Sequence, residues 1–92
     1  MSKYRIVPTG YFKQDLKTAR NRGYNLSLLG EVVDTLREGN KLPQKYKDHS
    51  LGGNYSGCRE CHITPDWLLI YEIFDGELIL YLTRTGTHSN LF

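Results

Sequence analysis

The sequence predicts an α+β fold, in which an N-terminal strand and two helices pack on a twisted, mainly antiparallel sheet. Three observations predict it: a short strand-like run near the start, two stretches with helical spacing of apolar residues, and then several apolar runs separated by turn residues. Helices that precede a meander of strands pack on one face of that sheet. The length, 92 residues, suits one domain over 1–92 with one modest core.

The first half of the chain contains the predicted strand and helices. These elements span residues 4–7, 11–22 and 25–38. Pro8 and Gly10 end the strand, since proline lacks an N–H for the ladder. Gly23 stops the first helix, and Asn25 caps the second, which Gly39 and Asn40 end.

The second half reads as a loop followed by a meander. Residues 41–57 are polar and glycine-rich, with at most a short strand, and three strands follow at 59–64, 67–74 and 77–85. The dipeptide Asp75-Gly76 predicts a two-residue type I′ hairpin. With that turn, paired residue numbers sum to 151, so Trp67 would face Arg84, with His88 close by.

All three histidines lie in this second half, each in a short polar motif: His49, His62 and His88. Histidine is the side chain whose ordinary pKa, about 6.5, allows proton transfer near neutrality. Their placement indicates proton-transfer chemistry on an anionic substrate. His88 stands four residues from the C-terminus, and we expect the last five residues to contribute little to the core.

One reaction that fits these residue types is RNA cleavage without a metal ion. It needs a base for the 2′-hydroxyl, an acid for the leaving 5′-oxygen and a cation for the phosphate, and Arg84 can supply the cation. Trp67 or Phe92 can stack on an unpaired base. Each of these candidate residues also has an ordinary structural explanation. His62 would be a strand residue, and Trp67 would lie in the core. Composition alone does not name the substrate.

The segment Cys58-Arg59-Glu60-Cys61-His62 matches the pattern of c-type haem attachment and contains possible zinc ligands. Haem attachment requires export, and the N-terminus has no apolar secretion signal. A strand would place Cys58 and Cys61 on opposite faces, which disfavours a shared metal ion. We therefore expect two reduced structural cysteines, no metal ion and no cofactor.

Charge is unevenly distributed along the chain. Residues 1–30 carry six Lys or Arg against one Asp, a net +5, whereas residues 31–92 carry six against nine acids, a net −3. The basic first third suits a polyanion or an acidic protein partner, or is an ordinary solvated face. No window approaches the roughly 18 apolar residues of a membrane span. We expect a cytoplasmic protein with no membrane contact.

Three segments resemble the YafQ family of bacterial toxins, which belongs to the RelE/ParE superfamily. They are residues 46–49, 57–71 and 84–92. The spaced set His, His-x-x-x-Asp-Trp and Arg-Thr-Gly-Thr-His-x-x-x-Phe is specific, and the resemblance covers the whole chain because length and element order also agree. It implies a RelE-like fold.

The resemblance also implies a function and a set of residues. The function is that of a type II toxin: a ribosome-dependent endoribonuclease that cuts mRNA in the A site of the 70S ribosome and inhibits translation. A co-encoded antitoxin of the DinJ type would hold it inactive, and operator DNA would be reached only through that antitoxin. The functional residues implied are catalytic His49, His62, Asp66 and His88, and substrate contacts Lys47, Trp67, Arg84 and Phe92.

Within this set, we assign His49 as base and His88 as acid, with Asp66 orienting a protonated histidine and His62 assisting phosphate or proton transfer. Two other classes of function remain open. A toxin of the ParE branch would act on DNA gyrase without cutting RNA, and a binding module would use the basic face of the first helix on DNA.

Overall fold

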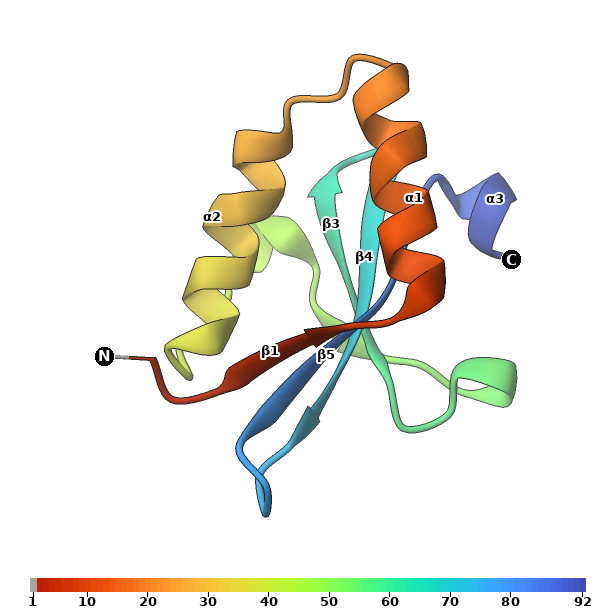
Figure 1. Ribbon diagram of the computed structural model, residues 1–92. Coiled ribbons are helices and arrows are strands. Elements are labelled where there is room, and N and C mark those ends of the chain that lie inside the picture. Colours follow the sequence, from red (N-terminus) through yellow and green to blue (C-terminus); the bar gives the residue numbers. More distant parts are fainter. Residues whose placement is uncertain (1) are drawn as a thin grey trace.

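A five-stranded sheet runs through the molecule in the order β1-β5-β4-β3-β2 (Figure 1). The computed structural model describes residues 2–92. The elements are β1 (Arg5–Pro8), α1 (Gly10–Asn21), α2 (Leu26–Arg37), η1 (Gln44–Tyr46), β2 (His49–Ser50), η2 (Gly53–Tyr55), β3 (Arg59–Thr64), β4 (Trp67–Phe74), β5 (Ile79–Gly86) and α3 (His88–Leu91). β1 pairs with β5 in parallel, and the other neighbouring strands are antiparallel. The predicted α+β class is confirmed.

Helices α1 and α2 lie against one face of the sheet (Figure 1). The Thr9 hydroxyl accepts the Phe12 N–H and starts α1 one residue earlier than predicted. Asn25 caps α2 as predicted, because its side chain accepts the Ser27 N–H. Gly39 ends α2 with φ +83°, a conformation that glycine adopts without steric cost.

The β4–β5 turn differs from the predicted two-residue hairpin. Phe74 pairs with Ile79, so four residues form the turn, and Leu78 adopts a positive φ of 55°. Contacts to the N-terminal segment hold this longer turn: the Tyr4 hydroxyl donates to Asp75, and the Leu78 carbonyl accepts the Arg5 N–H. Tertiary contacts thus override the local turn preference of Asp-Gly.

The pairing of β4 with β5 shifts again between Ile70 and Tyr71, where a bulge adds one residue to β5. As a result Arg84 pairs with Ile70, and the predicted pairing of Arg84 with Trp67 is wrong. Successive residues beyond the bulge keep alternate faces, so Thr85 lies on the helix side and Arg84 on the other side.

Two apolar clusters pack on opposite faces of the sheet. The larger one joins α1 and α2 to β3, β4 and β5. The smaller one consists of Cys58, Leu68, Ile70 and Leu91, so α3 packs on the face opposite α1 and α2. Buried Leu91 corrects the expectation that the last five residues contribute little to the core. Across residues 2–92, no helix has the length and apolar character needed to cross a membrane.

Candidate active site

The sheet face opposite α1 and α2, here called the open face, carries a row of paired residues across four strands, three of which contribute a polar side chain. Its members are direct pairing partners: His49 in β2 faces Glu60 in β3, Glu60 faces Ile70 in β4, and Ile70 faces Arg84 in β5. Directly paired side chains lie on the same face, about 4.5–5.5 Å apart at Cβ. The fold therefore brings a histidine, a carboxylate and a guanidinium from distant parts of the sequence onto one row.

Glu60 joins two of the histidines. One of its carboxylate oxygens lies 3.6 Å from His49 Nε2 and 3.5 Å from His62 Nε2. Glu60 is only 4% exposed, whereas the His49 side chain is half exposed. The same carboxylate oxygen therefore lies within ion-pairing distance of both rings.

The other nitrogen of each ring faces a backbone carbonyl. His49 Nδ1 lies 2.7 Å from the Lys47 carbonyl oxygen, and His62 Nδ1 lies 3.4 Å from that of Pro65. A carbonyl oxygen only accepts, so both contacts favour the proton on Nδ1. In the neutral rings, this leaves the Nε2 lone pairs turned toward Glu60.

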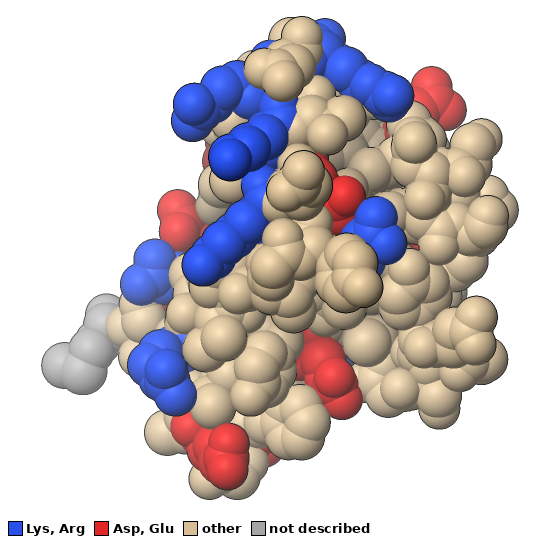
Figure 2. All heavy atoms as spheres, turned by 45° about the vertical axis from the view of Figure 1, so that its right-hand side comes forward, with Lys and Arg blue, Asp and Glu red and all other residues tan. Residues whose placement is uncertain are grey.

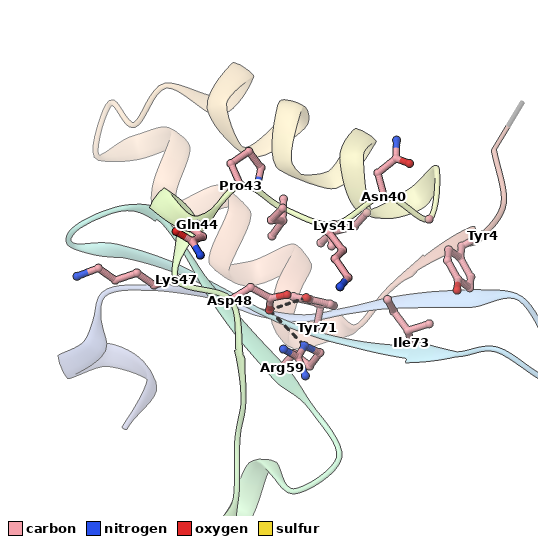
Figure 3. A pocket seen from close by; sticks show the side chains of 13 residues that line it. Tyr4, Asn40, Lys41, Pro43, Gln44, Lys47, Asp48, Arg59, Tyr71 and Ile73 are labelled. Atoms are coloured by element: carbon pink, nitrogen blue, oxygen red, sulfur yellow. Dashed lines mark hydrogen bonds and ion pairs between the residues drawn. The ribbon is translucent and has the colours of Figure 1, made fainter.

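The strand that presents His49 is anchored from behind, on the helix side of the sheet. Asp48 accepts a hydrogen bond from the Tyr71 hydroxyl at 2.7 Å and one from Arg59 Nε at 3.3 Å, as Figure 3 shows. Burial, and then the bond to Asp48, raises the pKa of Tyr71. Because neighbouring strand residues point to opposite faces, fixing Asp48 also fixes His49 on the open face.

Asp48 lies in a cleft of about 810 Å³ between the end of α2, the 40–47 loop and the sheet (Figure 3). Lys47 stands at one end of that cleft, with an exposed side chain and a positive φ of 52°. The carbonyl oxygen of Lys47 contacts His49, so the backbone of Lys47 is part of the site. Substrate contact by its side chain stays a prediction.

Arg84, at the other end of the row, is held by α1. Its Nε donates to Asp15 Oδ2 at 2.7 Å, and its Nη2 donates to Asp15 Oδ1 at 3.1 Å. These bonds raise the pKa of Arg84 against the partial burial that lowers it, and the nearby Tyr55 hydroxyl also raises it.

The C-terminal residues form an aromatic cluster with Tyr55, the residue whose hydroxyl lies near Arg84. The His88 and Phe92 rings stack with centroids 4.8 Å apart, and Phe92 meets Tyr55 edge-on at 5.4 Å. The Tyr55 hydroxyl donates to the Leu91 carbonyl. His88 is exposed and Phe92 is 55% exposed, so both rings remain accessible to a ligand.

Trp67 and Asp66 do not occupy the predicted positions. Trp67 is 3% exposed, packs on Tyr24 and donates from Nε1 to the Thr85 hydroxyl, so the prediction that it stacks on a substrate base is wrong. Its place on β4 puts it on the helix side of the sheet. Asp66 is exposed in the β3–β4 turn, and within residues 2–92 it forms no hydrogen bond or ion pair with a histidine. Its orienting role stays a prediction.

The two cysteines lie on opposite faces, as the strand periodicity predicted. Cys58 belongs to the open-face cluster and Cys61 to the helix-side cluster, and both are free thiols. Burial raises the pKa of Cys61 to about 12, so the thiol stays protonated at neutral pH. In the described part of the chain, no group of three or more His, Cys, Asp or Glu is arranged to hold a metal ion.

Glu60, Asp15 and Tyr55 are the site residues that the sequence analysis missed. A signal for Glu60 existed, because Glu60 and His62 are two apart in a predicted strand and must share a face. Asp15 and Tyr55 carried no such signal, since they reach the site from a helix and a loop. Together the open face offers proton donors and acceptors, a cation and aromatic rings, which suits proton transfer on a phosphodiester.

The chain is similar to known proteins over nearly its whole length. A family model described as "Bacterial toxin of type II toxin-antitoxin system, YafQ" matches residues 4–92. The chain is 39% identical over 88 residues to the "mRNA interferase toxin YafQ" of Escherichia coli K12, covering 95% of this chain and 94% of that protein.

Solved structures of similar proteins have the same fold. The crystal structure of the E. coli DinJ-YafQ toxin-antitoxin complex contains a chain with a TM-score of 0.89 and 37% identity, covering 98% of both chains. A metal-bound toxin from Helicobacter pylori matches with a TM-score of 0.90 and 43% identity over the full length of both chains. The fold and element order are therefore shared over the whole chain.

Proposed function

The chain belongs to the YafQ family of toxins of bacterial type II toxin-antitoxin systems, and we propose that it is a ribosome-dependent endoribonuclease that cleaves mRNA in the A site. Cleavage there would inhibit translation in the cytoplasm. The observation that carries this proposal is the cross-strand row on the open face, in which a Glu60-bridged histidine pair and Arg84 share one surface.

The reaction divides into two proton transfers around one phosphorus atom. A base takes the proton from the 2′-hydroxyl, and the 2′-oxygen attacks phosphorus. The bond to the 5′-oxygen then breaks, an acid protonates that oxygen, and the products are a cyclic 2′,3′-phosphate and a 5′-hydroxyl. No metal ion is needed if both groups and a cation are in place.

In our proposal His49 is the base, since its ring is half exposed and Nδ1 is turned to the Lys47 carbonyl, which leaves Nε2, beside Glu60, to take the proton. Glu60 stabilises the imidazolium that forms, and His62 shares that carboxylate and assists proton transfer. His88 is the acid, on the C-terminal segment that packs on the open face through Leu91. Phe92, stacked on His88, is positioned to receive an unpaired base.

The partner that we propose is a co-encoded antitoxin of the DinJ type, and operator DNA would be contacted only through it. The structural similarity to the toxin chain of the E. coli DinJ-YafQ complex supports this assignment. Binding over the open face would silence the site without any change in the fold.

A primer-extension assay tests the function. Purified protein is added to ribosomes that hold an mRNA with a defined A-site codon, and separately to the same mRNA without ribosomes. We expect cuts in the A-site codon only when ribosomes are present, a loss of roughly 10²–10⁴ in rate for His49→Ala, and little change for its neighbour Ser50→Ala. Inhibition of gyrase supercoiling without any RNA cut would instead favour the ParE-like alternative.

A further inference from the structure

Arg84 is the cation of the cross-strand row, and its orientation is set by one residue of α1. Asp15 accepts two hydrogen bonds from it, from Nε and from Nη2. A guanidinium has five N–H donors, so three remain beyond the pair with Asp15, two at Nη1 and one at Nη2, and the Tyr55 hydroxyl lies near them. The pair is fork-to-fork, a geometry that fixes the plane of the guanidinium as well as its position.

Asp15 is itself fixed by the sheet. β1 ends at Pro8, and α1 covers the edge of β5 that β1 leaves unpaired. There Asp15 Oδ2 accepts the Thr85 N–H at 3.2 Å. Thr85 is held in turn, because its hydroxyl accepts from Trp67 and donates to the Leu68 carbonyl. The Asp15 side chain is only 15% exposed, so Arg84 is paired with a carboxylate that is held in place.

The guanidinium also lies near an aromatic ring of α1. Tyr11 stands one helical turn before Asp15 on α1, and the Arg84 guanidinium lies 5.4 Å from its ring centroid. Tyr11 is 73% exposed and lies at the surface. The arginine is thus bounded by a carboxylate and a ring from the same helix, and its remaining donors lie near the Tyr55 hydroxyl.

We propose that Asp15 is a positioning residue for RNA cleavage, which aims the free donors of Arg84 at the phosphate that accumulates charge in the transition state. The inference rests on the proposed endoribonuclease function. Asp15 cancels the net charge of Arg84 locally, so it does not strengthen attraction for RNA. Its effect falls on the rate of cleavage after binding.

The test compares variants in single-turnover cleavage of mRNA on ribosomes. Asp15→Asn keeps the shape and an oxygen for the Thr85 N–H but loses the charged fork. We expect its maximal cleavage rate to fall roughly 10- to 100-fold, with ribosome affinity unchanged or tighter. Asp34→Asn removes the same charge from an exposed position on α2 and should cleave like the wild type.

A double-mutant cycle separates positioning from a merely structural role. If Asp15 acts through Arg84, adding Asp15→Asn to Arg84→Gln costs no further rate. Arg84→Lys keeps the charge without the fork and should lose rate like Asp15→Asn. It replaces Asp15→Asn as the test if Asp15→Asn fails to fold. If the rate losses of Asp15→Asn and Arg84→Gln multiply in the double variant, the proposal is wrong. It is also wrong if Asp15→Asn cleaves as fast as the wild type. A wild-type protein that does not cut ribosome-bound mRNA refutes the proposed function instead.

Discussion

His88 and Leu91 stand three residues apart on α3 and have opposite environments. His88 is exposed and stacks on Phe92, whereas Leu91 is buried against Leu68 and Ile70. Residues three apart lie on roughly the same side of a helix, so the contrast arises because this single turn reaches the sheet through Leu91 and not through His88. The C-terminal segment therefore serves the proposed chemistry and the core through different residues.

His88→Gln should lower the cleavage rate by roughly 10²–10⁴, because the amide keeps hydrogen bonding but cannot transfer a proton. Its thermal unfolding should stay within about 0.5 kcal/mol of the wild type, as is usual for exposed positions. Single-turnover cleavage and thermal melts measure the two effects. An active His88→Gln protein would remove His88 from acid–base work and leave His49 with His62.

The buried thiol of Cys61 predicts how stability depends on pH. Burial raises its pKa to about 12, from about 9 in the unfolded chain, so the folded state favours the protonated thiol. The sign follows: the stabilisation is complete below pH 9 and is lost as pH rises toward 12. Denaturant unfolding between pH 9 and 11 should show a steeper loss of stability for the wild type than for Cys61→Ala. Equal slopes for the two proteins would contradict the prediction.

At the scale of elements, α1 has two functional faces. Phe12 and Ala19 pack against the sheet, while Lys13, Lys17 and Arg20 are exposed. Figure 2 shows Lys and Arg side chains gathered over this helix. A basic surface next to a candidate RNA site is suited to docking on rRNA.

Neutralising Lys13, Lys17 and Arg20 with Gln should weaken association with ribosomes and make it less sensitive to salt, because each lost phosphate contact lowers the salt slope by about one. Binding measured over a series of salt concentrations tests this. Lys41→Gln with Lys45→Gln, on the loop after α2, is the control. If binding by the triple variant matches the wild type, that face is solvated or reserved for the antitoxin.

For α3, the structure predicts a stability effect that the sequence did not suggest. Leu91→Ala removes a buried side chain from the open-face cluster and should cost about 2 kcal/mol, at the low end for such changes because a chain terminus can relax. Denaturant unfolding measures it, with Ser89→Ala on the same turn as control. A loss below about 0.5 kcal/mol would mean that α3 is not anchored.

At the scale of the whole molecule, the cysteines and histidines are distributed over two faces of one sheet. Cys61 lies between Glu60 and His62 on β3, and its side chain packs on the helix side of the sheet. The proposed reaction relies on proton transfer by side chains and does not need a metal ion. A metal-bound relative from H. pylori makes metal independence a question for this protein's own activity.

We expect the protein to keep full cleavage activity after it is stripped with EDTA and exchanged into metal-free buffer before it meets ribosomes. Treating the toxin alone matters, because the ribosome itself requires Mg²⁺. Metal analysis of the purified protein should find no stoichiometric zinc or haem. Activity that is lost on stripping and restored by one metal ion would contradict this expectation.

The sequence by itself determined the fold class, the order of the main strands with α1 and α2, and most of their bounds, but not α3. These features depend on local patterns: the apolar periodicity of α1 and α2, the Asn25 cap, and the alternation that separates Cys58 from Cys61. The YafQ resemblance likewise depended on spaced residues, and the family assignment agrees with it.

Only the tertiary structure decided how the site is assembled. Contacts from Tyr4 and Arg5 lengthened the β4–β5 turn, and a bulge then paired Arg84 with Ile70 and left Trp67 in the core. A shift of one residue exchanges the two faces of a strand, so these register changes decide which side chains meet. The bond from Arg84 to Asp15 spans 69 positions of sequence, and no local pattern encodes a contact of that range.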